Sequence, residues 1–275
     1  MVSKYEHGGL GSSNEKKKLA AQIELMQGDC LEIMGKLDAE RGAFVDLIFC
    51  DPPYFLSNGG MTCQNGTMAK VDKGDWDRSE GCEKNLEFNL SWLKACQKLL
   101  KPDGSIMVSG TFHSIYSVGF AMQSLGMKLL NNITWQKPNP PPNLSCRYFT
   151  HSTETVIWAA KDINSKHKFN YSLMRELNNG KQMKDVWVMT APGKKEKEYG
   201  RHPTQKPLQL VDQLILAATD PSDLVLDAFN GSGTTGVSCI NNQRRYVGIE
   251  LDPTYISLSK KRFRAAKKSI KTGLI

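Results

Sequence analysis

Residues 224–236 read LVLDAFNGSGTTG, which combines a short apolar run, an acidic residue and three glycines spaced as G-x-G-x-x-G. The run Leu224–Leu226 predicts a buried strand and Thr234–Asn241 predicts a helix, so the glycines lie in the turn between the two elements. Glycine lets the backbone turn tightly and approach a ligand closely. The stretch therefore predicts a ligand-binding turn of an α/β sheet.

Two acidic residues narrow the choice of ligand for this turn. Asp227 follows the strand directly, and Glu250 ends a second predicted strand, Tyr246–Ile249, where its carboxylate can accept two hydrogen bonds from a ribose diol. A nicotinamide dinucleotide needs its pyrophosphate at the helix N-terminus, whereas S-adenosyl-L-methionine carries a ribose, an adenine and a cationic sulfonium but no phosphate. Asp227 suits a cation and repels a pyrophosphate, which favours S-adenosyl-L-methionine. The residues predicted to contact it are Asp227, Phe229, Asn230, Gly231, Ser232, Gly233, Thr234, Thr235, Glu250 and Leu251.

A second motif, D-P-P-Y at residues 51–54, follows the compact apolar run Val45–Cys50. Such a run is typical of a strand that is buried on both faces of a parallel sheet. Two successive prolines cannot continue a hydrogen-bonded ladder, so the chain must turn there. The motif is therefore expected at the carboxyl edge of the sheet, where open α/β sheets bind their ligands.

The residue types of this motif suit methyl transfer to an exocyclic amino nitrogen. The lone pair of such a nitrogen is delocalised into the ring. The carboxylate of Asp51 and the carbonyl oxygen of Pro52 can each accept one N–H, which draws the nitrogen toward tetrahedral geometry and frees the lone pair. Tyr54 offers a flat ring to a base flipped out of its duplex, with stacking worth ~1–3 kcal/mol. The predicted catalytic residues are Asp51, Pro52, Pro53 and Tyr54.

Strands and helices alternate along the rest of the chain. The predicted strands are 23–26, 105–109, 128–136 and 155–159, and the predicted helices are 31–37, 88–100, 114–125, 207–218 and 253–266. This alternation predicts an α/β fold, a mostly parallel twisted sheet with helices on both faces. Residues 1–20 are expected to be a disordered lead-in and 21–275 a single domain. Within it, 55–86 is expected to form a mobile loop and 160–206 to lack regular structure.

Charge and composition narrow the class of partner. The formal net charge is +8, and residues 137–201 hold 12 basic against 6 acidic side chains, which favours a polyanionic partner because neutralised phosphates release counterions. The seven cysteines form no CxxC pair, so neither a disulfide framework nor a metal site is expected. No apolar run approaches the ~20 residues of a membrane span, and the polar N-terminus lacks a secretory signal. A cytoplasmic protein without a membrane partner is therefore expected.

Together, the two motifs resemble those of the amino-methyltransferases of DNA. D-P-P-Y at 51–54 precedes the glycine turn at 227–236, an order similar to that of the circularly permuted beta class. The resemblance runs from about residue 22 to residue 264. It implies a Rossmann-like class I methyltransferase fold that uses S-adenosyl-L-methionine, with a target-recognition insertion at about 138–201. One departure is Ala228, where the family usually has proline, and this changes the stiffness of the loop more than its chemistry.

The same resemblance implies further cofactor contacts. A short acidic motif near the N-terminus of the family contacts the cofactor, and Gly28-Asp29-Cys30 matches it, so Asp29 and Cys30 are candidates. The stretch HPTQKP at 202–207 resembles the family segment that opens the helix beside the methionine end of the cofactor. Lys206 is therefore a candidate, although the stretch can also be read as a simple helix start. Asp51 is expected to border the cofactor as well.

A narrower resemblance points to a target sequence. Residues 55–60, 71–77, 135–137, 143–154 and 180–187 look like those of the DpnA-type enzymes of GATC-specific restriction systems. This implies a restriction-modification role, adenine in GATC as the target, and double-stranded DNA as the partner, with single-stranded DNA as a further substrate. The family often forms homodimers, so a homodimer is a candidate assembly. The predicted DNA contacts are Lys137, Arg147, Tyr148, Arg175, Lys181 and Lys184.

Other functions stay open on the residues alone. An N4-cytosine methyltransferase uses the same geometry, but that class more often carries Ser at the position of Asp51. Protein-glutamine and RNA methyltransferases more often begin the tetrad with Asn and place the cofactor motif first. The alternative outside the enzymes is a DNA-binding homologue that has lost activity. The intact Asp51, Tyr54, Asp227 and Glu250 argue against that alternative.

Overall fold

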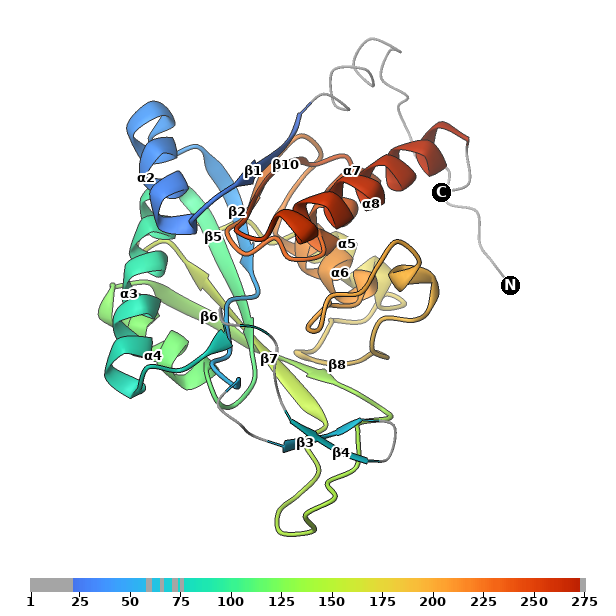
Figure 1. Cartoon of the computed structure of the whole chain (residues 1–275). Helices are drawn as coiled ribbons and strands as arrows, with labels where there is room; N and C mark the ends of the chain where they lie inside the picture. The colour runs from blue at the N-terminus through green and yellow to red at the C-terminus, as the bar shows by residue number, and fades with distance from the viewer. Residues whose placement is uncertain (1–21, 58–60, 65–66, 71–73, 75–76, 273–275) are drawn as a thin grey trace.

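A single large sheet organises the fold in the computed structural model, which describes residues 22–57, 61–64, 67–70, 74 and 77–272 (Figure 1). Its strand order is β1-β10-β9-β2-β5-β7-β6-β8. Neighbours from β1 to β5 are parallel, β7 is antiparallel to β5 and to β6, and β6 is parallel to β8. The strands are β1 (Ile23–Gln27), β2 (Val45–Cys50), β5 (Leu100–Gly110), β6 (Lys128–Gln136), β7 (Thr153–Ala160), β8 (Val186–Val188), β9 (Leu224–Asp227) and β10 (Arg245–Glu250). The prediction of a mostly parallel sheet is confirmed, while the predicted lead-in 1–20 lies outside the described residues.

Helices cover both faces of this sheet (Figure 1). One face carries α2 (Cys30–Arg41), α3 (Cys82–Leu99) and α4 (Ile115–Ser124), and the other carries α6 (Leu208–Ala218), α7 (Thr234–Asn241) and α8 (Pro253–Lys271). Along β2, Ile48 and Cys50 pack into the first core, and Leu47 and Phe49 pack into the second, because successive side chains of a strand point to opposite faces. The continuous apolar run of β2 is therefore buried on both faces, as predicted.

The segment 55–86 differs from its predicted lack of regular structure. It contains an antiparallel hairpin of β3 (Met61–Gln64) and β4 (Thr67–Lys70), and α3 begins at Cys82 rather than at residue 88. The first turn of α3 is largely exposed, and its cap residue, Gly81, has no side chain that could accept a hydrogen bond from the helix N-terminus. Neither the apolar periodicity nor the capping residue that predicts a helix start is therefore present in the sequence.

The segment 160–206 also holds short elements that were not predicted. They are α5 (Tyr171–Leu177), β8 and the 3-10 turn η2 (Lys195–Lys197), each too short to show a period. Pro207 is the cap residue of α6 rather than its first helical residue. α8 continues past residue 266 to Lys271 through a basic stretch without apolar spacing. Within the described residues, no helix combines the length and the apolar character that crossing a bilayer requires.

Candidate active site

The carboxyl ends of neighbouring parallel strands border one cavity of about 300 Å³. β2 and β9 pair directly, with Leu47 beside Val225 and Ile48 beside Leu226. The acidic residues at the ends of these strands, Asp51 and Asp227, therefore both line the cavity. The D-P-P-Y motif and the glycine turn meet at one site, although they lie at opposite ends of the sequence.

Nearly all the residues predicted to contact a cofactor line this cavity. They are Asp29, Cys30, Asp51, Lys206, Asp227, Phe229, Asn230, Gly231, Ser232, Thr234, Thr235, Glu250 and Leu251. Gly233 does not line it, but caps α7 with a left-handed φ of 75°. The predicted catalytic residues divide, because Asp51 and Pro53 line the cavity whereas Pro52 and Tyr54 are buried and do not.

The glycines of the turn serve packing as well as ligand approach. A Cβ added at Gly233 would lie 2.7 Å from Ser259 Oγ, and a Cβ added at Gly236 would lie 2.3 Å from Phe263 Cζ. Ser259 and Phe263 both belong to α8, which packs against α7. The third glycine of the motif thus allows α7 and α8 to pack closely, and this packing supports the turn on the side of α8.

Asp227 is a buried carboxyl in the wall of the cavity. Its Oδ1 accepts the Phe229 backbone N–H at 3.0 Å, and its Oδ2 accepts the Thr235 hydroxyl at 2.6 Å. Burial raises its pKa to about 7, and the nearby carboxylates of Asp51 and Glu250 act in the same direction against those two hydrogen bonds. A cationic ligand in the cavity would stabilise the ionised form.

Two more acidic residues shape the walls of the cavity. Glu250 accepts the backbone N–H of Gly231 at 2.6 Å and that of Asp252 at 2.9 Å, and burial raises its pKa. Asp29 caps α2 by accepting the backbone N–H of Leu31 at 2.8 Å and that of Glu32 at 3.1 Å. An ionised carboxylate has about four acceptor positions, so each can accept a ligand hydrogen bond as well.

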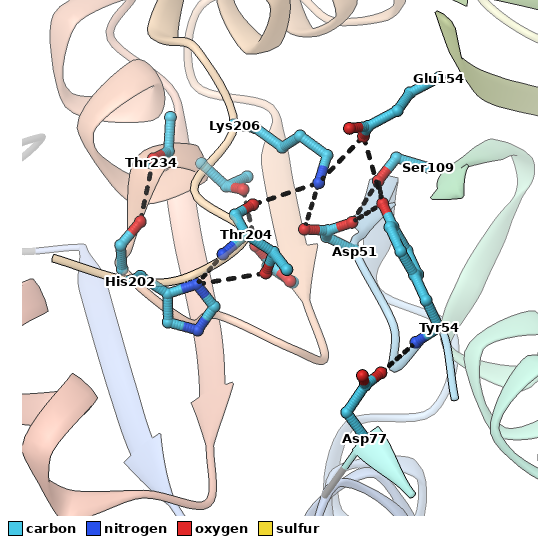
Figure 2. A network of polar contacts seen from close by, with 12 residues as sticks. Asp51, Tyr54, Asp77, Ser109, Glu154, His202, Thr204, Lys206 and Thr234 are labelled. Atoms are coloured by element: carbon cyan, nitrogen blue, oxygen red, sulfur yellow. Dashed lines mark hydrogen bonds and ion pairs between the residues drawn. The ribbon is translucent and has the colours of Figure 1, made fainter. Parts of the chain in front are cut away.

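Asp51 is the centre of a polar network (Figure 2). Its Oδ1 accepts the hydroxyls of Tyr54 and Ser109, each at 2.5 Å, and its Oδ2 accepts the ammonium of Lys206 at 2.6 Å. Ser109 lies near the end of β5, the strand next to β2. Three donors, one on β5 and two in the loops after β2 and before α6, therefore fix the orientation of this carboxylate.

Charges of alternating sign extend this network away from the cavity. The buried ammonium of Lys206 lies 2.6 Å from Asp51 and 3.5 Å from Glu154, and Glu154 pairs in turn with Lys137. Burial by itself would lower the pKa of Lys206, but the carboxylates of Asp51 and Glu154 outweigh it and the pKa is raised. Burial would likewise raise the pKa of Glu154, but the two lysines lower it. The network therefore consists of two carboxylates and two ammonium groups without net charge.

Lys137, predicted to contact DNA, and Tyr54, predicted to stack on the base, both take part in this polar network. The Lys137 ammonium is paired with Glu154 inside the network and lies 4.6 Å from the centroid of the Trp135 ring. The ring of Tyr54 is only 4% exposed, and its hydroxyl is turned inward to Asp51. Burial first, and then the charges of Asp51 and Glu154, raise the pKa of Tyr54. Both side chains belong to the interior of the site because they complete the hydrogen bonds of its acids.

Asp77 holds the backbone that follows D-P-P-Y. Its Oδ1 accepts the N–H groups of Tyr54 and Phe55, each at 2.8 Å, and its Oδ2 accepts the N–H of Leu56 at 3.1 Å and the hydroxyl of Ser57 at 2.9 Å. The Asp77 side chain is fully buried, and Phe55 has a left-handed φ of 58°. One carboxylate thus fixes a turn that the backbone of a non-glycine residue adopts at a cost.

The other predicted DNA contacts lie outside the cavity. Arg147 and Tyr148 are exposed in the loop before β7, and Lys181 and Lys184 are exposed between α5 and β8. Arg175 is also exposed, but two of its guanidinium nitrogens donate to the carbonyl oxygen of Gly180 at 2.9 and 3.1 Å. Part of its hydrogen-bonding capacity therefore closes the end of α5.

Sequence reasoning missed four residues of this site, namely Ser109, Glu154, Asp77 and Gln205. The sequence does contain a signal for Glu154. It is the first acidic residue after Asp103 and lies at the start of an apolar strand, which marks it as a candidate site residue. Asp77 and Ser109 lie in stretches whose contacts with D-P-P-Y exist only in the folded chain. Among the described residues, no group of three or more His, Cys, Asp or Glu side chains is arranged to hold a metal ion.

Comparison with known proteins identifies the family. A family model described as DNA methylase matches residues 45–261. The chain is 48% identical to the type II methyltransferase M2.DpnII of Streptococcus pneumoniae over 96% of this chain and 97% of that protein. It is 46% identical to the type II methyltransferase M2.MboI of Moraxella bovis over 88% and 87% of the two chains. The crystal structure of the M1.HpyAVI-SAM complex is 29% identical, with a TM-score of 0.67, and the match covers 87% of this chain and 98% of that one. The chain belongs to the DNA methylase family.

Proposed function

We propose that this chain transfers a methyl group from S-adenosyl-L-methionine to N6 of adenine in double-stranded DNA, within the sequence GATC. One observation carries the proposal: Asp51 of D-P-P-Y and Asp227 of the glycine turn line the same cavity. Relatives that are 48% and 46% identical are named as type II methyltransferases, which supports a role in a restriction-modification system. Position 51 is an aspartate, whereas N4-cytosine methyltransferases more often carry serine there. This supports N6 of adenine over N4 of cytosine as the target.

The residues of the cavity fit S-adenosyl-L-methionine. The buried Asp227 carboxyl, with its raised pKa, suits the positive charge of a sulfonium or an ammonium. Gln205 lines the cavity, and its Oε1 atom is buried without a hydrogen-bond partner among the described residues. This oxygen can therefore accept a hydrogen bond from a ligand ammonium. Glu250 and Asp29 supply carboxylates for the ribose and the adenine. When bound, the cofactor supplies an electrophilic methyl group, so the chain has mainly to position the acceptor nitrogen.

Asp51 can receive the target amino group without losing its present partners. Three donors occupy its two oxygens, and a carboxylate offers about four acceptor positions. One amino N–H would donate to Asp51 and the other to the carbonyl oxygen of Pro52, which frees the nitrogen lone pair for attack. Lys206 balances the charge of Asp51 throughout. Methyl transfer leaves the acceptor nitrogen with a positive charge, and this nitrogen then releases one proton, with solvent water as the final acceptor.

Several finer features belong to the same proposal. The target base is flipped out of the duplex, because its amino group cannot reach a buried carboxylate otherwise. The segment 138–201 recognises the target, and single-stranded DNA is a further substrate. The enzyme works in the cytoplasm, with a homodimer as its candidate assembly. The exposed Arg147, Lys181 and Lys184 support DNA contact by this segment.

A labelled-methyl assay with base analysis tests the proposal. Wild-type chain is incubated with methyl-labelled S-adenosyl-L-methionine and a duplex that holds one GATC site, and the DNA is digested to nucleosides. We expect label in N6-methyladenine and none in N4-methylcytosine. A duplex with GATC changed to GTAC is the sequence control and should remain unlabelled.

The variant Asp51→Ala separates catalysis from binding in the same assay. We expect it to transfer less than about 1% of the wild-type label while it keeps binding DNA and cofactor. Label in cytosine would make the chain an N4-cytosine enzyme. Wild-type chain that binds DNA but transfers nothing would instead identify an inactive DNA-binding homologue.

A further inference from the structure

An exposed stack of three aromatic side chains, Phe112, His151 and Tyr148, lies outside the cavity. The rings of Phe112 and His151 stack with centroids 4.6 Å apart and an interplanar angle of 29°. Tyr148 continues the series, with its ring 5.3 Å from that of His151 at an angle of 31°. Phe112 is 45% exposed and Tyr148 is 60% exposed. Large exposed aromatic rings that are grouped together, rather than scattered singly, mark a binding surface. We call these three side chains the ring stack.

The ring stack is joined to the catalytic network by two short segments of chain. Phe112 follows Ser109, the donor to Asp51, by three residues, and His151 precedes Glu154 by three residues. β5 and β7 are antiparallel neighbours, so both segments leave the sheet at the same place. Three extended residues span at most about 10 Å, which corresponds to about three base steps of a DNA strand.

The charge around the ring stack suits a phosphate-bearing partner. Residues 104–153, which contain all three rings, include no aspartate or glutamate. Arg147 precedes Tyr148 directly and is exposed. A nucleic-acid strand can therefore reach the rings without like-charge repulsion from this part of the chain, and a guanidinium lies close enough in sequence to hold a phosphate.

We propose that the ring stack binds the exposed face of a nucleobase that neighbours the target adenine. The inference rests on the proposed function, because only base flipping or a single-stranded substrate exposes such a face. Flat rings that lie three residues along the chain from Ser109 and Glu154 can stack on the base that loses its neighbour when the adenine leaves the strand. Base stacking on aromatic rings tolerates any base, so the ring stack adds affinity rather than sequence selection.

The double variant Phe112→Ala with His151→Ala tests this inference in the full-length chain. Steady-state methyl transfer is measured on a GATC duplex and on the corresponding single strand. We expect the KM for DNA to rise roughly five- to hundredfold on at least one of the two substrates, with kcat at saturating DNA and the Kd for S-adenosyl-L-methionine unchanged. The substrate that shows the rise identifies whether base flipping or a single strand exposes the base face.

Two matched variants control for loss of structure. Phe169→Ala removes the same side chain at the same 45% exposure, also in contact with another ring, that of Trp158, and should leave the KM for DNA unchanged. Phe112→Trp keeps a flat ring and should retain wild-type KM. If Phe112→Trp shows the same rise as the alanine variant, packing and not stacking is responsible and the inference is overturned.

Substrates that lack one base complete the test. Abasic sites are placed in turn at the positions on either side of the target adenine. At the position that the ring stack contacts, wild type and double variant should have equal KM values, because the base that distinguishes them is missing. An undiminished difference at every position would overturn the inference. Absence of methyl transfer by the wild type would instead overturn the proposed function, so the two failures are distinct.

Discussion

Asp227 illustrates how a single residue can couple cofactor binding to pH. Its carboxyl is buried, and its pKa of about 7 lies well above the usual value for aspartate. A protonated carboxyl attracts a cation less than a carboxylate does. The protonation state of Asp227 in the ligand-free chain therefore decides how strongly a positively charged ligand binds.

We predict that affinity for S-adenosyl-L-methionine rises with pH up to about 7 and levels off above it. A bound cation lowers the pKa of Asp227, so binding below pH 7 releases a proton and affinity changes by up to about tenfold per pH unit. Isothermal titration calorimetry in two buffers of different protonation enthalpy measures this release. Asp227→Asn should bind more weakly and show no such release, and a flat affinity profile in the wild type would contradict the prediction.

Lys206 has a different role at the residue scale, because it separates two buried carboxylates. We predict that Lys206→Met lowers the free energy of unfolding by about 3–5 kcal/mol, since it leaves Asp51 and Glu154 without their shared cation. Urea denaturation at neutral pH measures the change. Lys98→Met is the control, because the Lys98 ammonium pairs with Asp38 at the surface and its loss should cost less than about 1 kcal/mol.

Element-scale organisation of the site depends on the loop that follows β2. Asp77 accepts hydrogen bonds from three successive backbone N–H groups, those of Tyr54, Phe55 and Leu56, so a residue near the end of this loop fixes the start of the loop. We predict that Asp77→Ala lowers kcat at least about tenfold, because the position of Tyr54 and Asp51 is no longer held. The Kd for S-adenosyl-L-methionine should stay within about twofold of wild type, since Asp77 does not line the cavity.

An activity loss in Asp77→Ala has to be separated from general unfolding. Asp77→Asn retains one acceptor oxygen and should recover part of the lost kcat, with an unchanged KM for DNA. Equal kcat in wild type and Asp77→Ala would show that the loop holds its geometry without this carboxylate.

The contact between α7 and α8 leads to a prediction about the glycine motif. A Cβ at Gly236 would meet Phe263 Cζ at 2.3 Å, so Gly236→Ala forces the two helices apart. We expect a loss of about 1–3 kcal/mol in unfolding free energy and weaker cofactor binding, measured by denaturation and calorimetry. Gly35→Ala in α2 is the control, because nothing lies within 4 Å of its added Cβ and alanine favours a helix there. Phe263→Leu should partly rescue Gly236→Ala if the ring is the obstacle.

Which elements could be predicted from sequence follows from how each is stabilised. The bounds of β2, β6 and β9 were predicted to within one residue. A strand that is buried on both faces appears in the sequence as a short apolar run, and turn residues on either side mark where a strand ends. The hairpin of β3 and β4 and the short α5 were missed, since their stability depends on contacts and not on a local period. The cofactor cavity followed from two local motifs, whereas Glu154 and Ser109 join Asp51 only through the pairing of β5 and β7 with β2.

At the scale of the whole molecule, net charge predicts how DNA binding depends on salt. The chain carries a net charge of +8, and Lys206 and Lys137 pair with carboxylates of the active site, so we expect phosphate contacts from other basic side chains. We predict that log K for a duplex falls linearly with log salt concentration, and that Arg147→Ala makes the slope shallower by about 1. Lys137→Met should leave the slope unchanged, and a slope change of similar size in both variants would contradict this assignment.

The strands that carry the two halves of the active site, β2 and β9, come from opposite ends of the chain and touch in the middle of the sheet. A nascent chain from which β9 has not yet emerged therefore has an unpaired edge on β2 and lacks the cofactor site. Enzymatic competence arises only at the end of translation, in one step. A premature stop anywhere between residues 55 and 227 would yield a fragment that contains D-P-P-Y yet is chemically inert toward DNA.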